Sequence, residues 1–379
     1  MKSVAKSLIR QVNDRADASC LNLGIGEPAF PPPRAIIEHV RGHLPEWKAS
    51  YSAVEGLPEL RRAVAEAAAR DGEGSIEAGR VCVTAGSQEA LFVLLITLLD
   101  PGDEVLVPDP GFPAYPSIAR IAGGAAVPYP LSFDGGFRLD PDDLLSRITP
   151  RTKAIVLNTP NNPAGSVYGD EALTKLAAGL AGSGIPVLAD ECYRALTFGP
   201  TPRSFFRLYP DAIAIGSLSK SHALTGWRLG WMIVPDRLAG RFSGVHQLAV
   251  TCASVVSQRA AIFALRGGAD EECAANLAEL ARRRDLAMAA LREFTGLSFH
   301  EPEGAFYLFA KADRECALAG GSLALALRLL EEEKVVITPG AAFGPGGEGF
   351  LRISFAAAPE TITAGLERMG RFLKRLRAE

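Results

Sequence analysis

The sequence has no marked excess of charge of either sign, no secretion signal and no run long enough to cross a membrane. Its 379 residues carry 40 Lys and Arg against 43 Asp and Glu, a formal net charge of −3. Such a balance predicts no basic surface for nucleic acid. The amino-terminal stretch MKSVAKSLIRQVNDRADA lacks the apolar core of a signal peptide and suits a short amphipathic helix. The longest apolar run, 90–99, is about half a membrane span. We therefore expect a soluble cytoplasmic protein with neither nucleic acid nor membrane as partner.

Paired cysteines and metal-ligand clusters are also missing. The six cysteines are Cys20, Cys82, Cys192, Cys252, Cys273 and Cys316. None forms a CxxC pair, so we expect reduced thiols rather than a disulfide framework. His39 and His43 have the spacing of a two-histidine metal face, but no third ligand or HExxH glutamate accompanies them. We expect no metal, and we find no internal repeat or low-complexity linker.

What the sequence does contain is material for a large folded protein. Hydrophobic residues make up 48% of the chain, and its length exceeds the roughly 250 to 300 residues of a single core. Seven short runs rich in β-forming residues alternate with helical stretches: VCVTAG, EVLVPDP, GAAVPYPL, AIVLNTP, IPVLADE, AIAIGSLS and LGWMIVP. This alternation predicts an α/β large domain with a mainly parallel seven-stranded sheet flanked by helices.

The pattern changes after Val234. Two long helical stretches, 245–268 and 271–294, precede four short strands (LSFH, AFYLFA, VVITPG, FLRISF) and helices at 323–334 and 359–377. These predict a smaller α+β domain. We place the domain limits at 1–30 for an amino-terminal arm with part of the small domain, 31–280 for the large domain and 281–379 for the small domain.

One turn places a lysine at the carboxyl end of a strand. In GSLSKSHALTGWRLGW, Lys220 follows an apolar strand and comes eight residues before Arg228. A buried lysine has a lowered pKa, and its neutral amine can form a Schiff base. A solvated turn lysine is the ordinary alternative. Arg228 and the hydroxyl of Ser217 nearby favour a pocket that also holds a phosphate.

Three other strand ends carry polar groups. VTAGSQEAL joins a strand to a helix through Gly86, Ser87 and Gln88, and the start of a helix binds anions or is simply capped. Asp190 ends the strand IPVLADE, where it either meets a ligand or caps a helix. NTPNNPAG, which includes Asn162, offers side-chain amides but is also an ordinary turn sequence. In an open parallel sheet these ends lie at one edge, where ligands bind.

Together these segments resemble the pyridoxal-phosphate-dependent aminotransferases of class I/II, fold type I, over nearly the whole chain. The resemblance rests on these segments: LNLGIGEPAF, YSAVEGLPELRRAVA, VTAGSQEAL, DPGDEVLVPDPGFPAY, NTPNNPAGSVY, DECYRALTF, GSLSKSHALTGWRLGW, PEGAFYLFA and PGAAFGPGGEGFLRISF. It implies a homodimer whose active sites are shared, with Tyr51 of one chain reaching the other's cofactor.

The resemblance also implies a role for each matching residue. Lys220 would bond to the cofactor's aldehyde and later move a proton between the substrate's α-carbon and the cofactor. Asp190 would pair with the ring nitrogen, so that the ring remains an electron sink. Tyr193 and Asn162 would hydrogen-bond the ring hydroxyl, and Phe112 would stack on the ring.

The remaining implied contacts hold the phosphate and the substrate. The phosphate would be held by Gly86, Ser87, Gln88, Ser217, Arg228 and, from the partner, Tyr51. Arg352 would bind the α-carboxylate of the amino acid as a bidentate fork. Asn162 and Gly26 would lie close to the same bound amino acid.

The implied activity is transfer of an amino group between an L-amino acid and a 2-oxo acid in two half-reactions. Alternatives are a C–S β-lyase of the same fold, or a non-catalytic sensor module of a transcription regulator. Such regulators carry an amino-terminal DNA-binding domain, for which the residues before Gly24 leave no room. Bacterial aspartate aminotransferases of this group often have a lysine where this chain has Gln88, so selectivity for aspartate is not expected. Arg34 or the partner subunit is another possible source of that charge.

Overall fold

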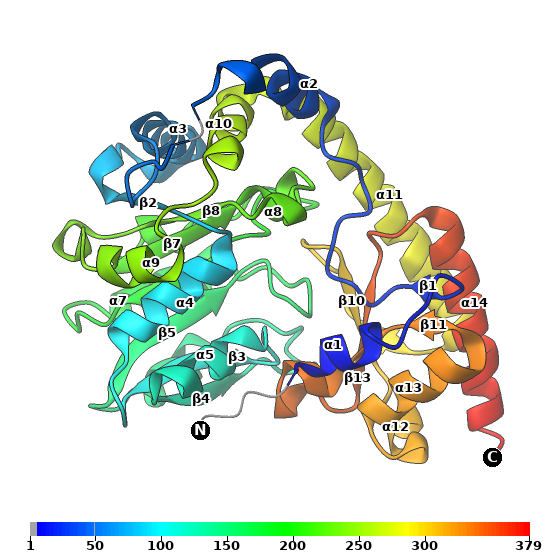
Figure 1. The fold of residues 1–379 in the computed structure, drawn as a ribbon. Helices are drawn as coiled ribbons and strands as arrows, with labels where there is room; N and C mark the ends of the chain where they lie inside the picture. The colour runs from blue at the N-terminus through cyan, green and yellow to red at the C-terminus, as the bar shows by residue number, and fades with distance from the viewer. Residues whose placement is uncertain (1–5, 49) are drawn as a thin grey trace.

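A seven-stranded sheet forms the centre of the larger part of the molecule, as predicted (Figure 1). The computed structural model describes residues 6–48 and 50–379. The strand order is β2-β8-β7-β6-β5-β3-β4, and every pair is parallel except the two made by β8. The strands are β2 (Val81–Thr84), β3 (Glu104–Asp109), β4 (Ala125–Pro130), β5 (Thr152–Asn158), β6 (Val187–Asp190), β7 (Ala212–Ser217) and β8 (Gly230–Ile233).

Helices cover both faces of this sheet. The helices of this larger part are α2 (Arg34–His43), α3 (Pro58–Ala68), α4 (Ser87–Leu98), α5 (Ala114–Ala122), α6 (Pro141–Ser146), α7 (Asp170–Gly179), α8 (Leu218–Ser221), α9 (Ser243–Val250) and α10 (Val255–Phe263). The two-sided burial is clear on β5. Ala154 and Val156 belong to the apolar cluster that includes α4 and α5, whereas Ile155 and Leu157 belong to the cluster that includes α7. Strands buried on both faces read as continuous apolar runs, which is why they could be found in the sequence.

The smaller part combines a four-stranded sheet with long helices. Its sheet has the order β12-β13-β10-β9, and a separate parallel pair joins β1 to β11. The strands are β1 (Leu21–Asn22), β9 (Ser298–Phe299), β10 (Tyr307–Lys311), β11 (Val335–Val336), β12 (Thr338–Pro339) and β13 (Phe350–Ser354). The helices are α1 (Leu8–Asn13), α11 (Asp270–Thr295), α12 (Asp313–Ala319), α13 (Ser322–Glu333) and α14 (Pro359–Leu376). The expected strand VVITPG is therefore two strands that belong to different sheets.

The helical stretch expected at 245–268 is broken. Thr251 has φ 64° and ψ −58°, outside the helical region, and α9 and α10 meet at a bend of 117°. In the described residues no single helix is both long and apolar enough to span a membrane, and these two reach that length and composition only as a bent pair.

A 26-residue helix, α11, connects the two parts (Figure 1). It packs along α14, and the predicted limit between residues 280 and 281 falls inside it. Through β1, the first strand of the chain joins the smaller part. The three domain ranges themselves remain a prediction.

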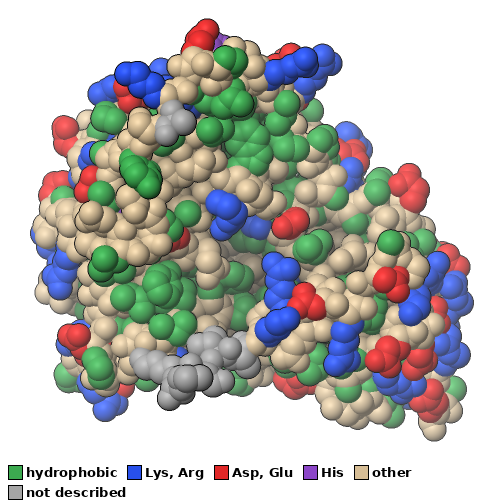
Figure 2. Space-filling model, in the orientation of Figure 1, with side chains coloured by type: hydrophobic (Ala, Val, Ile, Leu, Met, Phe, Trp, Pro, Cys, Tyr) green, Lys and Arg blue, Asp and Glu red, His purple; other side chains and the backbone are tan. Residues whose placement is uncertain are grey.

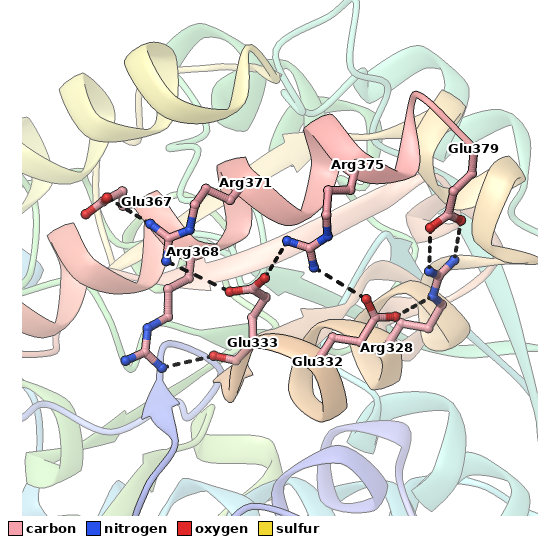
Figure 3. Close-up of polar contacts among 8 residues, drawn as sticks. All are labelled: Arg328, Glu332, Glu333, Glu367, Arg368, Arg371, Arg375 and Glu379. Carbon is pink, nitrogen blue, oxygen red and sulfur yellow. Dashed lines mark hydrogen bonds and ion pairs between the residues drawn. The ribbon is translucent and has the colours of Figure 1, made fainter.

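Ion pairs join α13 to α14 on the outside of the smaller part (Figure 3). Arg375 contacts both Glu333 (2.8 Å) and Glu332 (3.5 Å), and Arg328 pairs with Glu332 at 2.9 Å. Arg328 also binds both carboxylate oxygens of Glu379, each at 3.2 Å. Because the charges form a chain rather than isolated pairs, they fasten the last helix more firmly than single surface pairs do.

Candidate active site

Three parallel strands end side by side at one edge of the large sheet. Asn158, Asp190 and Ser217 are the last residues of β5, β6 and β7, and Asn158 is in register with Asp190. A cavity of about 680 Å³ opens at this edge. Figure 2 shows the molecular surface hollowed between the two parts of the molecule, with Lys or Arg side chains at the rim. The site lies where the sheet topology predicts it.

The cavity brings together most of the predicted site residues. Those that line it are Gly26, Ser87, Gln88, Phe112, Asn162, Asp190, Tyr193, Lys220, Arg228 and Arg352. Gly86, Ser217 and Tyr51 do not line it. Tyr51 is 85% exposed in its own chain. A second cavity of about 690 Å³, around Arg203, contains none of the predicted residues, so volume alone does not identify the site.

Lys220 projects its amine into this cavity from the short helix α8. Its Nζ donates to the backbone carbonyl of Gly26 at 2.6 Å. The pKa of Lys220 is lowered to about 8, mainly by burial and also by the Arg352 and Arg228 charges, while Cys192 and Glu27 oppose the change. A substantial fraction of the amine is therefore neutral near pH 8 and able to act as a nucleophile or base.

Asp190 is a buried carboxylate held by neighbours on both oxygens. Tyr115 donates to its Oδ2 at 2.6 Å, and the backbone N–H of Cys192 reaches its Oδ1 at 3.4 Å. Burial raises the pKa of Asp190, while these two hydrogen bonds and the charge of Lys220 oppose the rise. A cationic or N–H group entering the cavity would stabilise the charged carboxylate, so Asp190 is prepared for such a partner.

Two tyrosines from different parts of the chain meet in the cavity. The Tyr193 and Tyr307 hydroxyls are 2.9 Å apart, and burial raises the pKa of Tyr193 well above its usual value. The Cβ of a larger residue at Gly26 would lie 2.7 Å from the Tyr307 hydroxyl. Gly26 therefore leaves the room that Tyr307 needs to reach Tyr193.

Arg352 is a buried cation, 2% exposed, and none of the hydrogen bonds that it makes to the described residues goes to a carboxylate. Its guanidinium donates to Asn162 Oδ1 (2.9 Å), to the carbonyl of Gly24 (2.7 Å) and, less closely, to Thr338 Oγ1 (3.3 Å). The Nε has no hydrogen-bond partner in the structure. A buried cation without a counter-ion is costly, so this arrangement suits a site for an anionic ligand.

A second cation meets the start of α4. Arg228, held at φ 51°, donates to the carbonyls of Thr225 (2.8 Å) and, at 3.4 Å, Ala85. Gly86 precedes the first turn of α4 with φ 87°, and the Cβ of a larger residue there would lie 2.7 Å from Arg228 Nη2. A guanidinium against the amino end of a helix is a suitable setting for a phosphate group.

Ser217 and Ser219 have different surroundings. The Ser217 hydroxyl lies 3.0 Å from the carbonyl of Leu229 and 2.8 Å from the Ser219 hydroxyl, and it accepts from the Ser219 N–H. Ser219 lines the cavity, whereas Ser217 does not. In this structure Ser217 orients the turn, and Ser219 is the serine next to the cavity.

Several cavity residues were not predicted from the sequence. They are Ile9, Arg10, Asn13, Ile25, Glu27, Leu91, Tyr115, Asn158, Cys192, Thr225, Gly226 and Tyr307. Tyr115 and Tyr307 stand inside quoted motifs, three residues after Phe112 and within AFYLFA, so their segments were identified although their contacts were not. Arg10 does not belong to any of the quoted motifs. Its place follows from α1, which packs beside β12 in the smaller part.

No group of three or more His, Cys, Asp or Glu side chains within the described ranges is placed to hold a metal ion. His39 instead stacks on Phe263, with ring centroids 4.2 Å apart. His43 uses its Nδ1 in a hydrogen bond with the carbonyl of His39.

Comparison with known proteins agrees with this geometry. The family model described as aminotransferase class I and II matches residues 18–369. The chain belongs to this family. A probable aspartate/prephenate aminotransferase of Aquifex aeolicus is 35% identical over 94% of this chain and 91% of its own length.

Solved structures of aminotransferases also share the fold. The aspartate aminotransferase of Thermus thermophilus with maleate has a TM-score of 0.90 at 32% identity, covering 98% of this chain and 100% of that chain. An aromatic aminotransferase of Pyrococcus horikoshii also has a TM-score of 0.90 at 32% identity, covering 98% of this chain and 100% of that one. The protein is an aminotransferase, and its relatives differ in the amino acids for which they are named.

Proposed function

We propose that this aminotransferase holds pyridoxal 5′-phosphate in the cavity and exchanges an amino group between an L-amino acid and a 2-oxo acid. The observation that supports it most directly is the pair of cations in one cavity. Lys220 offers a partly neutral amine, and Arg352 offers a buried guanidinium without a counter-ion. The amine of Lys220 suits an aldehyde, and the guanidinium of Arg352 suits a carboxylate.

The residues present fit this cofactor. Arg228, together with the turn at Gly86, Ser87 and Gln88, would bind the phosphate, and Gly86 leaves space for Arg228 to approach. Ser217 supports the neighbouring turn that carries Lys220, through its hydrogen bonds with Ser219. Asp190 would pair with the ring nitrogen, which explains why a buried carboxylate is kept there.

Other cavity residues would orient the ring. Phe112 would contact its face, while Tyr193 and Asn162 would hydrogen-bond its hydroxyl. Asn162 is fixed for this by its backbone N–H, which donates to Asn158 Oδ1 at 2.8 Å. Tyr193 is fixed by Tyr307.

Each residue of the chain then has a part in the transfer. When bound, the cofactor would supply an electron-withdrawing ring that stabilises negative charge on the substrate's α-carbon. Arg352 binds the α-carboxylate and Gly26 bounds the space around the amino acid. Lys220 accepts the α-proton and returns it on the cofactor's side, and its lowered pKa suits both directions of this transfer.

Absorbance measurements on purified protein test this proposal. The wild type should bind pyridoxal 5′-phosphate with a visible absorbance change, which amino acids then convert. Lys220→Ala should abolish the covalent spectrum and turnover. Wild-type binding and turnover that persist in Lys220→Ala would overturn the assignment. Release of pyruvate and ammonia without a 2-oxo acid acceptor would show a C–S β-lyase instead.

We further propose that aspartate is not the sole substrate, because the neutral amide of Gln88 lines the cavity, and an amide cannot pair with a second carboxylate as a charge would. Arg34 lies outside the cavity and pairs with Glu38 at 3.1 Å. Arg10 does line the cavity. In a panel of amino acids, fast conversion by aspartate or glutamate alone would contradict the inference from Gln88.

We also propose that the protein works as a homodimer. Large apolar side chains are exposed near Tyr51 and on α9 and α10: Tyr51 85%, Leu248 90%, Val250 37% and Val256 40%. Such a surface in an otherwise ordinary globular chain indicates a contact with another chain. Tyr51 is exposed and does not line its own cavity, so it would serve the partner's phosphate site.

A further inference from the structure

His246, on α9, is fully buried and in contact with acceptors on both sides of its ring. Its Nδ1 lies 2.7 Å from Glu89 Oε1, and its Nε2 lies 2.9 Å from the backbone carbonyl of Val54. The side chain has 0% exposure. A carbonyl oxygen can only accept, so Nε2 must carry a hydrogen.

Whether the other ring nitrogen, Nδ1, also carries a hydrogen depends on Glu89. Either Nδ1–H donates to a charged Glu89, or a neutral Glu89 donates to Nδ1. The other oxygen of Glu89 accepts from the backbone N–H of Ala85, and Glu89 lies in the first turn of α4. Both features suit a Glu89 side chain that accepts hydrogen bonds from its neighbours. His246 is therefore an imidazolium that donates on both sides.

Each hydrogen-bond partner of this imidazolium is next to a segment that, in the proposed function, binds the phosphate. Through Ala85, Glu89 fixes the turn that continues into Gly86, Ser87 and Gln88. Val54 belongs to residues 50–56, the Tyr51 segment. This segment is fastened further where Ser243 donates to Glu55 Oε1 at 2.7 Å and where Gln258 Nε2 donates to Ser52 Oγ at 3.0 Å.

We propose that His246 is a positioning residue that holds the phosphate turn of its own subunit and the Tyr51 segment offered to the other subunit in one arrangement. The inference rests on the proposed function, because it assumes that both elements bind the phosphate of pyridoxal 5′-phosphate. It touches neither the ring nor the substrate, so its effect is confined to phosphate binding.

The charges around His246 support a dependence on pH. Burial lowers the pKa of His246, but the hydrogen bond and charge of Glu89, the carbonyl of Val54 and the charge of Glu55 together raise it above its usual value. Glu55 remains charged because Ser243 donates to it and Arg61 lies near, and both lower its pKa. Burial raises the pKa of the neighbouring Cys82 thiol to about 12, so it stays neutral.

The sign of this dependence follows from the raised pKa. The folded protein favours the charged ring, so its contribution is complete below the ordinary histidine pKa of about 6.5. It is lost as the pH rises through the raised value. Affinity for pyridoxal 5′-phosphate, compared with that for pyridoxal, should therefore fall on the alkaline side.

The test compares dissociation constants for pyridoxal 5′-phosphate and for pyridoxal, which lacks the phosphate. They are measured by absorbance titration of the cofactor-free wild type, His246→Gln and Glu89→Gln. Glutamine at 246 can donate from one nitrogen only, and glutamine at 89 keeps the shape but removes the charge. His300→Gln is a matched control, because that exposed ring hydrogen-bonds Phe133 in another region.

Both test variants should weaken pyridoxal 5′-phosphate binding by about tenfold or more, as expected for a lost charge-assisted hydrogen bond. Pyridoxal binding and His300→Gln should change by less than about twofold. As the pH rises above the ordinary histidine pKa of about 6.5, the dissociation constant for pyridoxal 5′-phosphate divided by that for pyridoxal should rise in the wild type and stay flat in Glu89→Gln. If His246→Gln does not fold, Glu89→Gln and the wild-type pH profile still decide.

Equal losses for both ligands, or no loss for either, would overturn the positioning role while leaving the proposed function intact. A pH ratio that rises equally in Glu89→Gln would also overturn it. Failure of the wild type to bind pyridoxal 5′-phosphate at all would overturn the proposed function itself. The two failures are therefore distinguishable.

Discussion

At the scale of single residues, the cavity contains two buried cations whose surroundings differ. Lys220 hydrogen-bonds one backbone carbonyl, and burial lowers its pKa to about 8. Arg352 keeps its charge, because a guanidinium does not lose its proton in the accessible pH range. Lysine can therefore act in proton transfer or covalent chemistry, whereas arginine can only bind.

This difference gives a prediction for pH. Only the neutral amine of Lys220 attacks an aldehyde, so the rate of covalent capture of pyridoxal 5′-phosphate should rise as the pH approaches about 8 and level off above it. Stopped-flow absorbance of the cofactor-free protein between pH 6 and 10 measures this rate. A plateau reached only near pH 10 would show that the amine behaves as a solvated lysine.

Replacement of Arg352 should affect binding of the amino acid without affecting binding of the cofactor. Arg352→Lys keeps a positive charge but loses the planar fork, so KM for the amino acid should rise by about 10- to 100-fold. The dissociation constant for pyridoxal 5′-phosphate should change little, because Arg352 contacts Asn162 rather than the phosphate turn. Steady-state kinetics and absorbance titration measure the two quantities. An unchanged KM would contradict the role of Arg352 in binding the carboxylate.

The residues of the site could be predicted only as far as local sequence determines them. Lys220, Asp190 and Asn162 stand at strand ends within motifs, and the cavity lining includes all three. The Tyr193–Tyr307 contact joins residues 114 positions apart, and only the folded chain brings them together. The different surroundings of Ser217 and Ser219 depend on the Leu229 carbonyl, which no local pattern indicates.

At the scale of elements, the central strands were predictable and the breaks were not. β5, β6 and β7 are apolar on both faces because helices cover both sides of the sheet. Residues 335–340 also read as one strand, but they pair with β1 up to Val336 and with β13 from Thr338. The pairing partner changes at Ile337, because the residues before it pair with β1 and the residues after it pair with β13. Hydrophobic pattern alone carries no information about which partner is nearer.

The ion pairs between α13 and α14 give a prediction about stability. Glu333 is 12% exposed and lies near Arg371 and Arg375, and its carbonyl accepts from Arg368 (Figure 3). Glu333→Lys should lower the free energy of unfolding by about 2 kcal/mol, since it replaces attraction with repulsion. The loss should shrink in 1 M salt.

Calorimetry at low and high salt measures this effect, with Glu367→Lys as the control. Glu367 is 53% exposed and pairs with Arg371 alone, so the loss there should be about 0.5 kcal/mol. Turnover should be unchanged in both variants. Equal losses at the two positions would show that the chain of charges adds nothing to single pairs.

At the scale of the whole molecule, the surface formed by Tyr51, Leu248, Val250 and Val256 predicts self-association. Leu248→Glu should give a monomer of 40.1 kDa, whereas the wild type should run at about twice that mass in sedimentation. Its fold should be retained, because Leu248 is 90% exposed in the single chain. Cofactor affinity should fall, since the partner's Tyr51 is then absent.

Leu318→Glu is the matched control for this experiment. Leu318 is 49% exposed and lies on α12, away from Tyr51. This variant should keep the mass and cofactor affinity of the wild type. A wild type that sediments as a monomer with full activity would contradict both the dimer and the shared site.

The contacts between the amino-terminal arm and residues 335–338 have a consequence for synthesis of the chain. The Thr338 hydroxyl donates to the carbonyl of Gly24 across 314 residues, and the arm that carries Gly26 is fixed only when these partners exist. A ribosome adds about 5 to 20 residues per second, so the arm waits roughly 15 to 60 s for its partners. The large sheet is complete by Ile233, well before this moment. A chain at this stage has every strand of the large sheet but lacks β12 and β13, which carry Thr338 and Arg352, so its active site is still unfinished.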